Sequence, residues 1–127
     1  MGNRAVIHIE GECTGIYMHW NGGRDSVEPL LQVARDYGIR GDDYGTARLT
    51  QIIGNTIGGK LSLGVSSLDR LDMDNGDNGT YVINDKFEIV ERLYMHNVPE
   101  NPPTPDAHDR ILKYIHSRND EAFEGAY

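Results

Sequence analysis

The sequence predicts an α+β domain, in which a mainly antiparallel sheet built from hairpins carries two to three packed helices. Three observations lead to this prediction. Short segments with alternating apolar and polar residues come in pairs separated by a turn. Longer segments have apolar residues every three or four positions. The length of 127 residues is that of one domain, so we expect residues 1–127 to fold as a single unit.

The first hairpin is predicted from residues 4–10 and 14–20. Ala5, Ile7 and Ile9 alternate with polar residues, and Gly11 supplies a tight turn before the second strand. The two strands are therefore expected to be antiparallel neighbours.

Two helices are predicted next. The first spans about residues 26–37 and ends at Gly38, with Asp25 and Glu28 as a capping box or Ser26 as the N-cap. Pro29 then falls in the first turn, where a missing N–H is tolerated. The second helix spans about residues 44–57, and its candidate core positions are Ala47, Ile52, Ile53 and Ile57.

The second half of the chain predicts three strands and a last helix. A strand at 60–66 precedes an acidic, Gly- and Asn-rich stretch at 69–79, which we expect to be a solvated loop. A second hairpin follows, with strands at 80–83 and 86–94. Thr104 as N-cap and Pro105 as the first helical residue begin a helix that ends near Arg118, with the apolar stripe Ile111, Leu112 and Ile115. The tail at 119–127 is expected to be frayed.

The segment between the first hairpin and the first helix is the strongest functional signal. It runs Trp20-Asn21-Gly22-Gly23-Arg24-Asp25-Ser26-Val27. Adjacent glycines allow a tight backbone turn and can expose successive N–H groups to an anion. The following helix adds its positive dipole end, and Arg24 adds a fork of donors. The pattern therefore predicts a phosphate-binding turn, although capping of a strand-to-helix turn alone would explain residues 25–28.

Further ligand contacts are expected from arginines and aromatic rings. Arg48 and Arg110 each lie early in a predicted helix and are candidates for a second phosphate, in the same subunit or across a subunit interface. Trp20 and Tyr81, together with Tyr44 and Phe87, are candidates for stacking on a base. The alternative for any single arginine is a solvated salt bridge.

Composition excludes several classes of protein. The net charge of −8 argues against general DNA or RNA binding, although a local basic pocket could still hold a small anion. A single cysteine, Cys13, fits a reducing cytoplasm, and we find neither a signal peptide nor an apolar run that could span a membrane. No catalytic constellation, metal-ligand spacing or cofactor motif is present, so we expect a binding protein without catalytic, metal or cofactor residues.

Three segments together resemble a family of phage proteins. They are Gly2-Asn3-Arg4-Ala5-Val6-Ile7, then Gly15 to Val27, then Asp77-Asn78-Gly79-Thr80-Tyr81-Val82-Ile83. The stretch from His19 to Val27 is the most specific of these. On these residues the chain is similar to the Thoeris anti-defence sponge family.

The resemblance implies a small α+β protein that forms homodimers or trimers of dimers in the host bacterial cytoplasm during phage infection. Such a sponge binds a cyclic nucleotide immune signal, a cyclic ADP-ribose isomer, without cleaving it, and some members also bind cyclic oligonucleotides. With such a ligand, Asn78 or Asn84 would read the adenine edge. The ligand-binding candidates are then Trp20, Asn21, Gly22, Gly23, Arg24, Arg48, Asn78, Tyr81 and Arg110.

Two other classes of function remain open. An acidic protein-binding inhibitor, or nucleic-acid mimic, is favoured by the charge of −8 and disfavoured by the glycine-rich turn. A small nucleotide-processing enzyme could use the turn from Asn21 to Ser26 to hold its substrate. The inhibitor predicts a protein partner, and the enzyme predicts an altered product.

Overall fold

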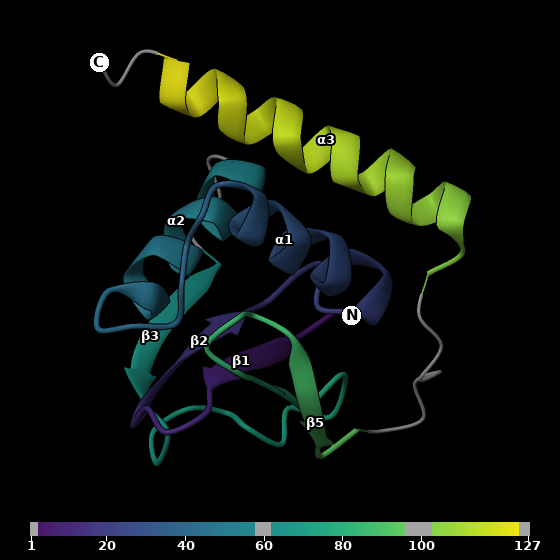
Figure 1. The fold of residues 1–127 in the computed structure, drawn as a ribbon. Coiled ribbons are helices and arrows are strands. Elements are labelled where there is room, and N and C mark those ends of the chain that lie inside the picture. The colour runs from purple at the N-terminus through teal and green to yellow at the C-terminus, as the bar shows by residue number, and fades with distance from the viewer. Residues whose placement is uncertain (1–2, 58–61, 96–102, 125–127) are drawn as a thin grey trace.

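The computed structural model describes residues 3–57, 62–95 and 103–124. In chain order its elements are β1 (Ala5–Ile9), β2 (Thr14–Met18), α1 (Arg24–Asp36), α2 (Gly45–Ile57), β3 (Leu63–Ser67), β4 (Thr80–Ile83), β5 (Ile89–Leu93) and α3 (Pro105–Glu124). Within these residues three helices pack on a five-stranded, mostly antiparallel sheet (Figure 1). The predicted α+β class is therefore confirmed.

The sheet has the strand order β3-β2-β1-β4-β5. Both predicted hairpins are present as antiparallel pairs, β1 with β2 and β4 with β5, and β3 pairs antiparallel with β2. The central pair, β1 with β4, is parallel. Local alternation of apolar residues marks a strand but does not select its neighbour, so this pair was not predicted.

The helices share one face of the sheet, and α3 crosses over α1 (Figure 1). Alternate residues of β1 and β2 point toward them, as expected for a strand with one face on a core. The core between sheet and helices is formed by Ala5, Ile7, Ile9, Ile16, Met18, Val27, Leu30, Leu31, Val33, Ala34, Leu49, Ile52, Ile53, Tyr81, Ile83, Phe87 and Ile115.

The opposite face of the sheet is covered in part by the loop at residues 68–79. The side chains of Leu68 and Leu71 lie against Gly15 of β2, where an added Cβ would be 3.0–3.2 Å from them. Thr80 of β4 donates through Oγ1 to the carbonyl of Met73 at 3.1 Å. The prediction of a loop at 69–79 holds, because these residues form neither helix nor strand. The expectation that it is solvated is wrong, because part of it packs on the sheet.

The start of α1 differs from the prediction. Gly23 is the N-cap, no side chain caps the helix, and Arg24 is its first residue. Glu28 pairs with Arg24 rather than completing a capping box with Asp25. Pro29 consequently lies inside the helix and not in its first turn. The end was predicted correctly, since Gly38 has the positive φ of 78° that follows many helices.

The predictions for the second and third helices are also corrected by the structure. In α2 the buried stripe is Leu49, Ile52 and Ile53, whereas the predicted core residue Ala47 is exposed. The predicted cap of α3 is confirmed, because Thr104 Oγ1 accepts the N–H of Ala107 at 3.3 Å. However, α3 continues to Glu124, well beyond the predicted end. Residues 60–61 of the predicted third strand and 125–127 of the predicted tail lie outside the described residues.

Tertiary contacts explain why α3 is longer than predicted. Asn119 is fully buried between α2 and α3. Its amide donates to Thr56 Oγ1 at 3.2 Å and accepts from Asn55 at 3.0 Å. Nearby, the Tyr37 ring packs edge-on against Phe123 with centroids 5.3 Å apart, and its hydroxyl donates to Asp120. Burial, together with that carboxylate, raises the pKa of Tyr37 to about 12.

Candidate functional site

The glycine-rich turn at residues 20–26 links β2 to α1 and packs against the start of β1. The N–H of Gly22 donates to the Asn3 carbonyl at 2.8 Å, and the Tyr81 hydroxyl donates to the Gly22 carbonyl at 2.7 Å. A Cβ at Gly22 would lie 2.5 Å from the Asn3 carbonyl oxygen. Gly22 is therefore required for the close approach of two backbone segments, whether or not a ligand binds.

The second glycine and the arginine form the start of α1. The Gly23 carbonyl accepts the N–H groups of Ser26 and Val27 at 3.0 and 2.9 Å. Arg24 donates through Nε to Glu28 Oε1 at 3.0 Å, and the two residues form an ion pair. The turn thus presents the positive end of the α1 dipole, while a carboxylate one helical turn away offsets part of the charge of Arg24.

A cavity of about 210 Å³ lies beside the turn. Asn21 and Ser26 line it from the turn, and the other lining residues come from β2 and all three helices: Met18, Leu30, Ile53, Thr56, Ile57, Ile111, Tyr114 and Ile115. Its walls are mainly apolar with a few polar groups, which is the usual character of small-molecule sites. Pockets that enclose a whole drug-sized ligand measure roughly 300–1,000 Å³, so this cavity would hold only part of one.

Sequence reasoning found the edge of this cavity and missed its walls. It singled out Asn21 and gave no functional weight to Thr56, Ile57 or Tyr114. Those residues belong to α2 and α3, and no local pattern indicates that two distant helices meet beside one turn. The available signal in the sequence was an aromatic residue, Tyr114, within a predicted amphipathic helix.

Tyr81 and Asn78 are structural in this fold. Tyr81 is fully buried, and the Arg92 guanidinium lies 3.8 Å from the centre of its ring. Because the side chain is fully buried and Arg92 lies over one face of the ring, Tyr81 offers no open face to a base, contrary to the prediction. Asn78 is also buried, and its amide nitrogen donates to the Arg4 carbonyl at 3.2 Å and to Asn3 at 2.5 Å. Asn78 therefore holds the N-terminal segment, and Tyr81 holds the turn through the Gly22 carbonyl.

The remaining predicted contacts are not gathered around the cavity. Arg48 and Arg110 are exposed on α2 and α3, and neither lines the cavity beside the turn. Arg48 lies over the ring of Tyr44, 5.1 Å from its centre. Trp20, the first residue of the turn, lines a different hollow. Within one subunit, therefore, Arg48 and Arg110 are not placed to hold a second phosphate at this cavity.

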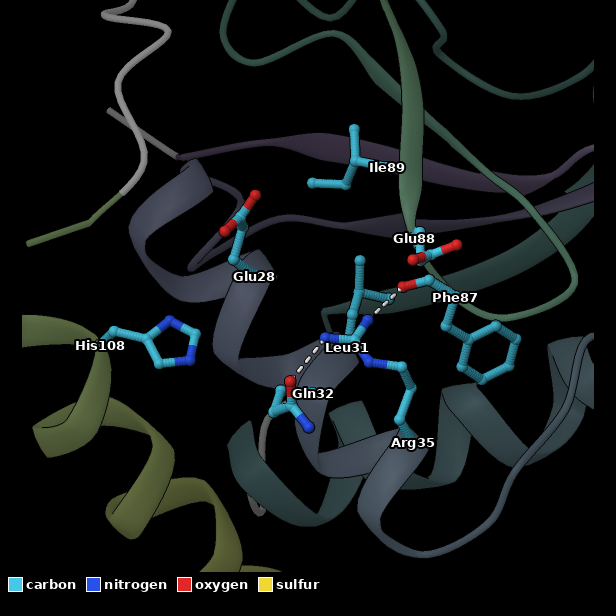
Figure 2. Close-up of a pocket in the computed structure, with 8 residues that line it drawn as sticks. All are labelled: Glu28, Leu31, Gln32, Arg35, Phe87, Glu88, Ile89 and His108. Atoms are coloured by element: carbon cyan, nitrogen blue, oxygen red, sulfur yellow. Dashed lines mark hydrogen bonds between the residues drawn. The ribbon is translucent and has the colours of Figure 1, made fainter. Parts of the chain in front are cut away.

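A second, polar cleft of about 540 Å³ lies between α1, the segment before β5 and the start of α3 (Figure 2). Its one arginine, Arg35, donates to the Phe87 carbonyl at 2.6 Å and to Gln32 at 2.8 Å. Glu28 and Glu88 also line the cleft. Two carboxylates beside an arginine that already has two acceptors disfavour a phosphate here.

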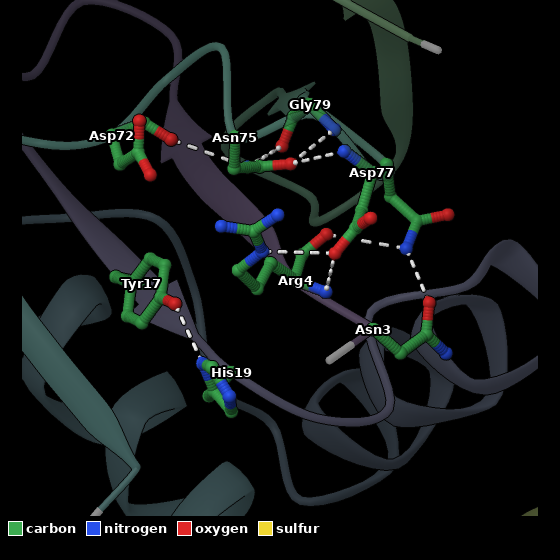
Figure 3. Close-up of polar contacts among 9 residues, drawn as sticks. Asn3, Arg4, Tyr17, His19, Asp72, Asn75, Asp77 and Gly79 are labelled. Carbon is green, nitrogen blue, oxygen red and sulfur yellow. Dashed lines mark hydrogen bonds and ion pairs between the residues drawn. The ribbon is translucent and has the colours of Figure 1, made fainter. Parts of the chain in front are cut away.

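The loop at residues 68–79, on the sheet face opposite the helices, is organised around the buried amide of Asn75 (Figure 3). Next to it, Asp77 accepts hydrogen bonds from the Arg4 side chain at 2.9 Å and from its backbone N–H at 3.1 Å. These bonds lower the pKa of the Asp77 carboxyl, and Asp77 raises the pKa of Arg4. The pair connects the loop to the residue before β1. Neither Arg4 nor Asp77 lines the cavity beside the turn.

Within the described parts of the chain, no group of three or more His, Cys, Asp or Glu side chains could hold a metal ion. Among the same residues, no helix combines the length and apolar character needed to cross a bilayer. Comparison with protein-family models, curated proteins and solved structures gave no match to this chain.

Proposed function

We propose that this protein binds a cyclic nucleotide at the turn from Asn21 to Ser26 and retains it without cleaving it. The observation that carries the proposal is the mainly apolar cavity next to a glycine-rich turn at the start of α1. Nucleotides combine a flat, weakly polar base with a charged phosphate, so they need these two kinds of surface side by side.

The two parts of the ligand would occupy different surfaces. The base enters the cavity between Ile53, Ile57 and Tyr114, where its removal from water is favourable. The phosphate stays at the rim, near the N-terminus of α1 and the guanidinium of Arg24. Because the chain as a whole carries a charge of −8, this local positive end would be decisive for binding an anion.

Sequestration as the biological role follows from the resemblance of residues 15–27 to the Thoeris anti-defence sponges. The ligand would then be a cyclic ADP-ribose isomer made by the host as an immune signal. A sponge must hold its ligand with slow release, which favours a preorganised pocket over a mobile one. The Gly22 N–H bond to the Asn3 carbonyl and the Tyr81 hydroxyl bond to the Gly22 carbonyl give the turn that rigidity.

A retention experiment tests the proposal. The purified protein is mixed with cyclic ADP-ribose isomers and cyclic oligonucleotides, freed of unbound ligand and heat-denatured, and the released material is analysed by mass spectrometry. Recovery of intact ligand in stoichiometric amount would support sequestration. An altered ligand would indicate the nucleotide-processing enzyme, and no retained ligand would favour the acidic protein-binding inhibitor.

A matched pair of variants tests the position of the ligand. Tyr114 and Tyr44 are both exposed, at 56% and 64%, but only Tyr114 lines the cavity. We expect Tyr114→Ala to weaken binding about tenfold or more, since stacking is worth roughly 1–3 kcal/mol per base. Tyr44→Ala should leave the affinity unchanged. Equal affinities for the two variants would place the ligand elsewhere.

A further inference from the structure

A further hollow, of about 360 Å³, lies at the end of β2 and the start of β3. We call it the aromatic hollow, and it is lined by Tyr17, His19, Trp20, Ser62 and Leu63. Trp20 is 39% exposed although it is the largest side chain in the protein, and it meets His19 edge to face with ring centroids 4.7 Å apart. The T-shaped contact with His19 leaves Trp20 partly exposed, so part of its ring is available for stacking.

The hydrogen-bonding groups of the aromatic hollow are oriented by their neighbours. Tyr17 and His19 share a hydrogen bond of 2.9 Å between the phenol oxygen and Nδ1 (Figure 3). Burial raises the pKa of the Tyr17 phenol. Because Nδ1 of His19 is bonded to Tyr17, Nε2 is the ring nitrogen that can hydrogen-bond a ligand.

Ser62 contributes the second polar group. Its Oγ is shielded from solvent and has no hydrogen-bond partner among the described residues. Its carbonyl accepts the N–H of His19 at 3.1 Å, which holds the two residues together. Buried polar atoms are paired in the great majority of cases, so an unpaired hydroxyl in the wall of a hollow indicates a missing partner.

We propose that the aromatic hollow is a second binding site, which takes a purine base stacked on Trp20. Purines combine a flat ring with in-plane hydrogen-bonding groups, and these match the exposed tryptophan ring, the Nε2 atom of His19 and the hydroxyl of Ser62. The site contains no cation among its lining residues, so it recognises the base and needs no phosphate. It is separate from the cavity beside Asn21 and does not depend on the proposed sequestering function.

The test uses adenosine, which carries no phosphate, and the fluorescence of Trp20, the single tryptophan of the chain. Adenosine should quench this fluorescence saturably, whereas uridine, with its smaller ring, should quench more weakly. Calorimetry then compares three variants that circular dichroism shows to be folded. We expect Trp20→Leu to weaken adenosine binding about tenfold or more, consistent with the loss of one stacked base. Ser62→Ala should weaken it by a smaller factor, and Tyr44→Ala, at an exposed tyrosine that lines neither hollow, should have no effect.

Three results would overturn the inference: no binding of adenosine, binding that Trp20→Leu leaves unchanged, or binding that Tyr44→Ala abolishes. If Trp20→Leu fails to fold, Trp20→Phe replaces it and should lose the larger part of the affinity. If the protein retains a cyclic nucleotide but adenosine does not change the fluorescence of Trp20, this inference alone is contradicted. Binding of adenosine without cyclic nucleotide retention would contradict the sequestering function and leave the aromatic hollow intact.

Discussion

Two segments of this protein have nearly the same composition and use it in opposite ways. Both the turn at residues 21–26 and the loop at residues 72–79 are rich in Asn, Gly and Asp. In the turn, the side chain of Asn21 is exposed, and the backbone of Gly22 makes the contacts to the rest of the fold. In the loop, Asn75 and Asn78 are only 3% exposed, and their side chains make the contacts.

The amide of Asn75 shows how the loop is held. Its nitrogen donates to the carbonyls of Asp72 and Gly79 at 3.2 and 3.0 Å, and its oxygen accepts the N–H groups of Asp77 and Gly79 at 3.2 and 3.0 Å. One side chain thus replaces the backbone pairing that a strand would supply. An Asn-Gly sequence predicts a turn, but what packs against it determines whether it becomes a scaffold or an exposed surface.

The largest expected effect on stability is in the loop at residues 72–79. Gly79 has a φ of 67°, and an added Cβ would lie 2.1 Å from the Leu93 carbonyl oxygen. Gly79→Ala should therefore lower the free energy of unfolding by at least about 3 kcal/mol, measured by urea denaturation. Gly38→Ala is the control, because its φ is similarly positive at 78° with no atom within 4 Å, and it should cost about 1–2 kcal/mol. Equal losses would show that the clash at Gly79 is relieved by movement of β5.

Asn75→Ala should have the next largest effect. It removes four hydrogen bonds and leaves buried backbone groups without partners. We expect a loss of about 2–4 kcal/mol in the free energy of unfolding. Hydrogen exchange should also accelerate at residues 72–79 before it does in the helices. Unchanged protection there would mean that other contacts hold the loop.

The ion pair between Arg4 and Asp77 should add a smaller, pH-dependent contribution. Its hydrogen bonds hold the pKa of Asp77 below the usual aspartate value of 3.8. A carboxyl with a lowered pKa stabilises the folded state fully above its unfolded pKa, so this stabilisation is present at neutral pH and lost as the pH falls below about 4. Asp77→Asn should therefore flatten the decrease in stability between about pH 4 and pH 2. If the free energy of unfolding falls equally with pH in wild type and variant, the ion pair does not cause the pH dependence.

The smallest effect is expected in the turn. Asn21 has a φ of 61° and an exposed side chain. Asn21→Gly relieves the left-handed conformation and loses little packing, so the free energy of unfolding should change by less than about 0.5 kcal/mol. A loss as large as that of Asn75→Ala would show that the turn is also a scaffold, and the contrast between the two segments would disappear.

The candidate site was predictable only in part. The glycine pair and the start of α1 were visible in the sequence because a tight turn and a helix start depend on nearby residues. The roles of Tyr81 and Asn78 were not, because both are set by partners far away in the chain: Arg92, Gly22 and the segment at residues 3–4. The walls of the cavity were also hidden, since they come from three separate helices.

The sequence alone determined the local elements of this protein: two hairpins, two central helices and the cap of α3 at Thr104. Each depends on side-chain periodicity or on turn and cap chemistry within a few residues. Only the tertiary structure decided the parallel pairing of β1 with β4, the extension of α3 to Glu124 and the burial of the loop around Asn75. These features depend on hydrogen bonds and packing between distant segments, which outweigh the weaker preferences of the local chain.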